Sequence, residues 1–285
     1  MLANLNDVLI SAQKGKYGVG LFNALSLEMA RGIIETAERL QAPVIVGTAE
    51  ILLPYAPLES VADLLVPMAK RACVPVVVHY DHGLTFEKCI LAMKLGFSSV
   101  MYDCSTDSYE ENVRKTAELT RVAHALGVTV EAELGHVGDN DSSVEGNGYL
   151  ADPAAYYTEP TQARDFVTRT GVDALAVAVG TAHGAYKMPP KLDFNRIEAI
   201  ARTIPTPLVL HGGSGLADAD FREAIRRGIS KVNIFTDINV ASAMGAQAAF
   251  AAGKRYMTDM VAYQIGAIAA AVEEKMHIFG SVGRA

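Results

Sequence analysis

The chain has 285 residues, of which half are hydrophobic and a fifth are charged, with a net charge of −7 and a pI of about 5.5. This composition excludes a disordered chain, and the lack of a basic excess argues against a nucleic-acid partner. No apolar run reaches the ~20 residues of a membrane helix, and the first residues lack a signal-peptide pattern. The cysteines at 73, 89 and 104 show no CxxC spacing. We therefore expect a cytoplasmic protein with reduced thiols and no membrane segment.

Short runs rich in Val, Ile and Leu alternate with longer amphipathic stretches along the whole sequence. The predicted strands are 18–22, 44–47, 76–80, 99–102, 129–133, 174–179, 208–210 and 231–234. Several of the helix-like stretches between them end at a glycine just before the next strand, which is a common helix stop. Apolar strands that alternate with helices predict a parallel sheet covered on its outer face.

Eight such repeats without a break in composition favour a closed (β/α)8 barrel, and a domain of this type typically has ~250 residues. We therefore predict a single TIM-barrel domain over residues 1–285. An open doubly wound sheet is the alternative. It would be expected to carry a GxGxxG fingerprint after the first strand, and GVGLFNALS has none.

Two segments depart from the simple repeat. Residues 135–160, after the fifth strand, are rich in Gly, Asp, Asn and Ser and are too long for an ordinary connection, so we expect a functional lid or disorder. After the eighth strand, an additional C-terminal helical segment is rich in Ala and Met and is apolar on more than one face. We expect that segment to cover the barrel or to contact another subunit.

Polar or ionisable residues follow nearly every predicted strand, although the strand bodies are mostly apolar. In this order they are Asn23, Thr48, Asp81, His82, Asp103, Glu133, His183, His211, Asn233 and Thr236. The carboxyl ends of the strands of a TIM barrel meet at one rim, where active sites form. The sequence therefore predicts an active site assembled from these residues.

Three histidines at strand ends, each next to a glycine, suggest one metal site. His82, His183 and His211 form a ligand trio of the kind that catalytic zinc uses, with a fourth position left open. The alternative for each one alone is a strand-end imidazole bonded to the backbone. The barrel brings the three ends together, which favours the metal. The other histidines are expected to be structural: His79, His124, His136 and His277.

Asp81 directly precedes His82. Neighbouring side chains on a regular strand point in opposite directions, so Asp81 is not expected to bind the same ion while the strand stays regular. We favour a role as general acid and base, with orientation of a ligand imidazole as the alternative.

The last quarter of the chain carries a phosphate signal. The sequence HGGSG, 211–215, follows the seventh strand, and Asn233 and Thr236 follow the eighth. Loops in these two places commonly bind phosphate through backbone N–H groups and helix N-termini. Ser214 offers a hydroxyl, and Lys187 offers a cation, unless it is only a surface lysine.

The motifs HYDHG, EAELGHVG, GTAHGAYK, LHGGSG and KVNIFTD together resemble the class II, metal-dependent ketose-bisphosphate aldolases. The resemblance runs from Phe22-Asn23 to the final helix. It implies a (β/α)8 barrel that cleaves fructose or tagatose 1,6-bisphosphate reversibly into dihydroxyacetone phosphate and glyceraldehyde 3-phosphate. In this family zinc stabilises the enediolate, and Asp81 would exchange a proton with the C4 hydroxyl.

The resemblance also implies roles for individual residues. His82, His183 and His211 would bind zinc, and Asp103 and Glu133 would support it or hold a second ion. Substrate and phosphate contacts would come from Asn23, Thr48, Gly184, Lys187, Gly212, Gly213, Ser214, Asn233 and Thr236. The family pattern admits a monovalent cation beside the zinc, and its habits suggest a homodimer or homotetramer.

The sequence departs from the family pattern in two places. The loop after EAELG reads GDNDSS, so either Asp139 or Asp141 acts as the acid of the lid, or the lid works differently in this chain. At the position where relatives carry an arginine for the distal phosphate, this chain has Lys254, followed by Arg255. A lysine is a point charge and an arginine a planar fork, so the exchange is not neutral.

Three other readings compete with a zinc aldolase for bisphosphates. One is a class II aldolase for a phosphorylated ketose without the distal phosphate. Another is a barrel that binds sugar phosphates without catalysis. The third is a Schiff-base aldolase, but its best lysine, Lys231, is expected at the start of a strand rather than at the rim. No motif distinguishes fructose from tagatose.

Overall fold

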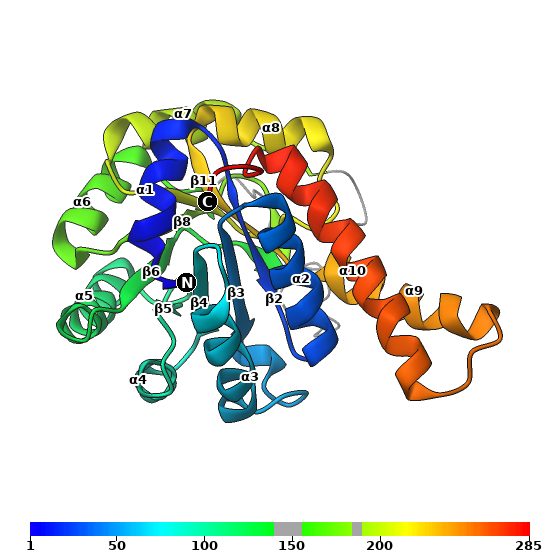
Figure 1. Cartoon of the computed structure of the whole chain (residues 1–285). Coiled ribbons are helices and arrows are strands. Elements are labelled where there is room, and N and C mark those ends of the chain that lie inside the picture. The colour runs from blue at the N-terminus through cyan, green and yellow to red at the C-terminus, as the bar shows by residue number, and fades with distance from the viewer. Residues whose placement is uncertain (140–155, 184–189) are drawn as a thin grey trace, which may run out of the picture.

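The computed structural model describes residues 1–139, 156–183 and 190–285 (Figure 1). Within them, eight parallel strands form a closed barrel in which each strand pairs with the next and the last pairs with the first. These strands are β2 (Val19–Asn23), β3 (Val44–Ala49), β4 (Val76–Gly83), β5 (Ser99–Tyr102), β6 (Thr129–Leu134), β8 (Ala174–Val177), β10 (Leu208–Leu210) and β11 (Ile229–Ile234). The predicted TIM barrel is therefore confirmed.

Two further strand pairings lie outside the ring. The short β1 (Leu2–Ala3) pairs with β4, and β7 (Gly138–Asp139) pairs with β9 (Ala182–His183). The helices of the described residues, most of which surround the barrel, follow in chain order (Figure 1). They are α1 (Leu5–Gly15), α2 (Leu27–Leu40), the 3-10 helix η1 (Glu50–Leu52), α3 (Leu58–Arg71), α4 (Phe86–Lys94), α5 (Tyr109–Ala125), α6 (Pro160–Thr170), α7 (Phe194–Thr203), α8 (Asp218–Arg227), α9 (Thr236–Ala251) and α10 (Met257–Phe279).

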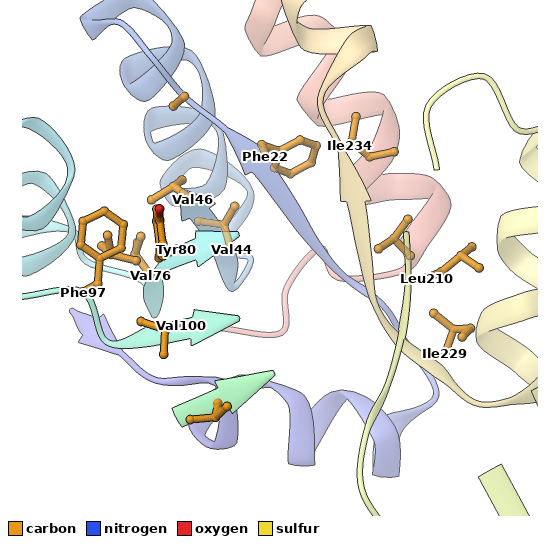
Figure 2. Packing of buried hydrophobic residues seen from close by; sticks show 14 of the residues in the cluster. Phe22, Val44, Val46, Val76, Tyr80, Phe97, Val100, Leu210, Ile229 and Ile234 are labelled. Carbon is orange, nitrogen blue, oxygen red and sulfur yellow. The ribbon is translucent and has the colours of Figure 1, made fainter. Parts of the chain in front are cut away.

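Local sequence signals explain where several helices begin. Ser26, Thr85 and Asp193 precede α2, α4 and α7, and each side chain accepts a backbone N–H of the first turn. The outward faces of the strands then pack on these helices. Figure 2 shows this layer, in which Phe22, Tyr80 and other buried side chains fill the space around the sheet.

The end of the barrel where the strands begin is filled by apolar side chains. Inward-facing residues of β2, β3, β4, β8 and β10 pack there against one face of α1, which closes this end. The cluster, called the lower core below, consists of Leu5, Val8, Leu9, Ala12, Tyr17, Val19, Leu21, Ile45, Val77, Ala174, Ala176 and Val209. The polar residues of the barrel interior therefore lie at the opposite end, where the strands finish.

The C-terminal segment forms an arm of two helices. α10 packs on α2 at its C-terminal part, while α9 and the start of α10 extend away from the barrel (Figure 1). Several large apolar side chains of this arm are exposed, namely Val240, Met244, Phe250, Tyr256 and Met257. No helix of the described residues is both long and apolar enough to cross a membrane.

Two strand boundaries differ from the expectation in ways that matter for the site. β4 does not end at Tyr80 but continues to Gly83, so Asp81 and His82 belong to the strand. β11 begins at Ile229, and Lys231 therefore lies inside the strand rather than at its start. Both differences arise because apolar periodicity marks a strand body more sharply than its ends.

Candidate active site

Alternate residues of three strands place five ionisable side chains and one amide inside the barrel, above the lower core. Side chains two apart on a strand share a face, so each strand contributes a pair. These are His79 and Asp81 from β4, Glu131 and Glu133 from β6, and Lys231 and Asn233 from β11. All six are buried. Ionisable groups are rarely buried unless they are paired, so this cluster marks a functional site.

Asp81 is held by two asparagine amides. The Nδ2 of Asn23 donates to Asp81 Oδ2 at 3.0 Å, and the Nδ2 of Asn233 donates to Asp81 Oδ1 at 3.1 Å. Burial by itself would raise the pKa of Asp81, but the charges of His82, Lys231 and His211 outweigh it and leave that pKa below its ordinary value. Asp81 is therefore an oriented, ionised carboxylate at neutral pH.

The end of β4 is irregular. His82 has a φ of +43°, and the pairing of β4 with β5 shifts register between Tyr80 and Gly83. A side chain at position 83 would lie 2.6 Å from Cys89 Sγ and 2.8 Å from the Met101 carbonyl, so only glycine fits there. The distortion removes the strict alternation that was expected to separate Asp81 from His82. Potential ligand atoms of both residues and of His211 lie within 4.8 Å of one another.

Each of the two described rim imidazoles is oriented by carboxylates. His82 Nδ1 lies 2.7 Å from Asp103 Oδ2, while His211 Nε2 lies 2.9 Å from Glu131 Oε1 and its Nδ1 lies 3.0 Å from Glu133 Oε2. The two rings are neighbours, with centroids 4.6 Å apart. Carboxylates that bond one ring nitrogen fix the tautomer and make the other a better metal ligand.

The electrostatics of this cluster favour an added cation. Among the described residues, four carboxylates, Asp81, Asp103, Glu131 and Glu133, surround these imidazoles, and the only ammonium within salt-bridge distance of them is that of Lys231. Such an excess of negative charge is costly without a positive partner. Nitrogen and carboxylate donors of this kind suit a divalent metal, so the residues fit one.

The raised pKa of His211 also indicates that this site favours a positive charge. Burial alone would lower its pKa, yet the hydrogen bonds to Glu131 and Glu133 raise the pKa to about 10. The two carboxylates thus strongly favour a positive charge at this ring. A metal that replaces the ring proton at Nδ1 satisfies the same preference.

His183 is placed by its backbone alone. In the two-stranded sheet, Asp139 pairs with His183, and Gly138 pairs with Ala182. A Cβ at Gly212 would lie 2.3 Å from the Ala182 carbonyl, so β9 packs against the loop that follows His211. The fold thus brings the backbones of all three predicted ligands to one rim. Gly184, Lys187 and Asp141 lie outside the described residues.

The two loops predicted to bind phosphate are joined to each other. Gly213 N donates to the Asn233 carbonyl at 3.2 Å, and Ser214 Oγ accepts from the backbone N–H groups of Phe235 and Asp237 at 3.3 and 3.5 Å. Ser214 therefore caps α9, whose first residue is Thr236. Its hydroxyl can still donate its proton to a ligand.

Three other candidates are not brought into the cluster. Thr48 is in register with Tyr80, so it shares the face of the sheet that meets the helices, and its hydroxyl donates to the Ala49 carbonyl at 3.5 Å. Lys254 and Arg255 lie in the turn between α9 and α10, at the outer end of the arm (Figure 1). Arg255 there binds the carbonyls of Phe250 and Lys254.

The sequence did not place several residues of the cluster at the site, although it named His79 as structural and Lys231 as a Schiff-base alternative. Glu131 and Lys231 form a wholly buried ion pair at 2.7 Å, and His79 Nδ1 lies 2.8 Å from Ser99 Oγ. Burial lowers the pKa of His79 to about 4, so this ring is neutral at pH 7. The sequence did contain a signal that could have found these residues. An ionisable residue two positions before a predicted site residue on the same strand shares its face, as Glu131 does with Glu133.

Comparisons with known proteins agree with this geometry. The family model described as "Fructose-bisphosphate aldolase class-II" matches residues 3–284. The chain is 39% identical to fructose-bisphosphate aldolase of Geobacillus stearothermophilus over 100% of this chain and 99% of that one. It is 38% identical to fructose-bisphosphate aldolase of Thermus caldophilus, with full coverage of both. The crystal structure of the YdjI aldolase of Escherichia coli K12 superposes with a TM-score of 0.89, at 35% identity and full coverage of both chains.

The chain is thus a closed parallel barrel with imidazoles and carboxylates gathered at one rim, and the family match places it among the lyases. The chain belongs to the class II fructose-bisphosphate aldolase family. Members of this family act on sugar phosphates and require a metal, and the donor set described above is consistent with that requirement.

Proposed function

We propose that this protein is a zinc-dependent aldolase that reversibly cleaves fructose or tagatose 1,6-bisphosphate into dihydroxyacetone phosphate and glyceraldehyde 3-phosphate. The observation that carries the proposal is the pairing of an oriented, ionised Asp81 with the rim imidazoles of His82 and His211. A carboxylate and a metal site side by side are what aldol cleavage needs, because the bond broken lies between the carbon next to the carbonyl and the carbon that carries the hydroxyl group.

His82, His183 and His211 would hold the zinc, with Asp103 and Glu133 as supporting carboxylates. When bound, the metal would polarise the carbonyl of the ketose and offset the negative charge that develops there. A monovalent cation beside it is compatible with the excess of carboxylates. Zinc is preferred over magnesium because the donors include imidazole nitrogens rather than oxygens alone.

Asp81 would take the proton from the C4 hydroxyl in cleavage and return it in the aldol direction. Its two asparagine partners fix the direction of the carboxylate, so little reorganisation is needed when the proton moves. Asn23 supports the same step. Its Oδ1 is buried and has no hydrogen-bond partner among the described residues, so it can accept a hydrogen bond from a substrate hydroxyl.

The phosphate of the dihydroxyacetone half would bind at the joined loops after β10 and β11. Gly212 and Gly213, which carry no side chains, would let the phosphate approach the backbone, Ser214 would donate its hydroxyl proton, and the N-terminus of α9 at Thr236 would add its dipole. The same proposal assigns Gly184 and Lys187 to this end of the substrate. Asp139 or Asp141 would supply the acid of the lid, and the pairing of Asp139 with His183 supports the first of these.

The distal phosphate raises a separate point. Lys254 and Arg255 lie at the end of the arm, away from the barrel, so they would serve a site only in a neighbouring subunit (Figure 1). The exposed apolar residues of the arm support such an assembly, a homodimer or homotetramer. If the protein were a monomer, Lys254 and Arg255 would have no role at the site. That result would favour the alternative function, an aldolase for ketoses that lack the distal phosphate.

The two remaining alternatives are less well supported. Lys231 is wholly buried, and its Nζ lies 2.7 Å from Glu131 and 2.8 Å from Asn233, so it is not presented to a substrate carbonyl as a Schiff-base lysine must be. A barrel that only binds sugar phosphates would not need an oriented carboxylate beside the metal ligands.

A coupled assay for the release of dihydroxyacetone phosphate tests the proposal. Fructose and tagatose 1,6-bisphosphate and the corresponding monophosphates are compared, with and without a chelator. We expect cleavage of at least one bisphosphate that the chelator abolishes and zinc restores. Cleavage of monophosphates alone would establish the alternative function, and a covalent adduct trapped by borohydride would overturn the zinc mechanism.

A further inference from the structure

A network of hydrogen bonds lies directly below the proposed reaction centre, and Lys231 is at its middle. Its Nζ donates to Asn233 Oδ1 at 2.8 Å and lies 2.7 Å from Glu131 Oε2. Lys231 is wholly buried, as is Glu131. An ammonium has three donors and no acceptor, so these two contacts decide how both neighbours are oriented.

The first contact fixes the amide of Asn233. Because Oδ1 accepts from Lys231, the amide nitrogen must point the other way, and there it donates to Asp81 Oδ1. An asparagine without this lysine could turn its amide over and present an oxygen to the carboxylate, which would repel it. The lysine therefore sets the donor that holds Asp81.

The second contact fixes Glu131. One oxygen of this carboxylate faces Lys231, and the other lies 2.9 Å from His211 Nε2. The lysine thus holds Glu131 in place as the partner of a proposed metal ligand. Carboxylates that bond a ligand imidazole in this way typically change metal affinity or activity by 10- to 100-fold when they are disturbed.

We propose that Lys231 is a positioning residue that couples the two halves of the site, the proton-transferring carboxylate through Asn233 and the metal-binding imidazole through Glu131. It touches neither substrate nor metal, and its effect reaches them through these two neighbours. The inference rests on the proposed function for its catalytic half, whereas its metal-binding half can be measured without any substrate.

The test uses Lys231→Met, Asn233→Ala, the double variant and Glu131→Gln with and without Lys231→Met. Lys115→Met is the matched control, since it removes an ammonium from a 2.8 Å ion pair with Asp107 on the outside of the barrel. The affinity of the metal-free protein for zinc is measured by competition with a chelator. Cleavage is then measured at saturating zinc with the substrate that the wild type cleaves.

We expect Lys231→Met to weaken zinc binding and to lower kcat roughly 10- to 100-fold each. KM should change little, because the bond from Gly213 N to the Asn233 carbonyl, which joins the phosphate loops, does not involve the lysine side chain. Because the lysine acts through its neighbours, its effect should almost disappear when the neighbour is already changed. Adding Lys231→Met to Asn233→Ala should lower kcat by at most about twofold, and adding it to Glu131→Gln should weaken zinc binding by at most about twofold. Lys115→Met should change neither quantity.

The proposal is overturned if Lys231→Met causes its full loss of kcat in the Asn233→Ala background and its full loss of zinc affinity in the Glu131→Gln background. A Lys231→Met protein with wild-type zinc affinity and kcat would also overturn it. If Lys231→Met alone does not fold, Lys231→Met in the Glu131→Gln background removes both charges together, and its zinc affinity relative to Glu131→Gln decides the question. A wild type that binds zinc but cleaves no ketose phosphate would end the proposed function. The zinc measurements would still decide the role of Lys231.

Discussion

The interior of the barrel has two halves that share the same eight strands and differ in what fills them. In the lower core, Leu21, Val77 and Val209 pack with α1 and leave no exposed surface of their own. Two residues further along the same strands, the side chains are Asn23, His79 and His211. One step of the strand period thus separates a core that stabilises the fold from a site that carries charge at the expense of stability.

The polar half should depend on a metal, and the apolar half should not. We expect prolonged treatment with a chelator to abolish cleavage and to lower the melting temperature by roughly 5–10 °C, because the carboxylates lose the cation that offsets their charge. Activity assays, elemental analysis and thermal melts before and after zinc is restored measure this. Full activity in protein shown to be metal-free would contradict it.

A change to the carboxylate of the polar half should remove catalysis and leave the fold. Asp81→Asn is expected to lower kcat by about 10²–10⁴-fold, since it removes the group that moves the proton, while bound zinc stays near the wild-type amount. Steady-state kinetics and metal analysis check both. Tyr80→Phe is the control, because the neighbouring side chain faces the helices and bonds Glu50. An Asp81→Asn enzyme as active as that control would exclude the assigned role.

A change in the lower core should have the opposite signature. Leu9 is wholly buried in it, and Leu9→Ala should lower the free energy of unfolding by about 2–5 kcal/mol through the cavity it leaves. Ile10, the next residue of α1, is 41% exposed, and Ile10→Ala should change stability by only about 0.5 kcal/mol. Urea unfolding gives both values. Loss of kcat in folded Leu9→Ala protein would show that the two halves are not independent.

The smallest expected effect is a difference in how fast a thiol reagent labels the cysteines, all of which lie outside the barrel interior. Burial raises the pKa of Cys104 to about 12 and that of Cys89 above its usual range, so both stay protonated and unreactive near pH 8, whereas Cys73 is exposed. A thiol reagent should label one cysteine of native protein at once and the other two only after unfolding. Rapid labelling of Cys104 would mean that the rim beside Asp103 opens readily.

The strands and most of the rim could be predicted because both rest on local pattern. Apolar runs mark the strand bodies, and the parallel topology forces their carboxyl ends together, so Asp81, His82 and His211 follow from the sequence alone. The distortion at His82 could not be predicted in the same way. It depends on how β4 meets β5 and on the space around Gly83, which are tertiary features.

The buried network was missed for a related reason. Glu131 and Lys231 alternate with apolar residues along β6 and β11, but alternation alone does not tell which face of a strand turns into the barrel. Only the closed barrel shows that they face each other across it. Thr48 is the opposite case, since its place after an apolar run suggested the rim, and register with Tyr80 turns it to the outer face.

The proposed function requires the polar half of the barrel to hold one catalytic zinc. Crystals of the zinc-loaded protein measured at the zinc absorption edge test it most directly. The account predicts one strong anomalous peak at the rim, within coordination distance of His82, His183 and His211 and next to Asp81. No peak at that position, or a peak bound by Asp103 and Glu133 without the histidines, would contradict it.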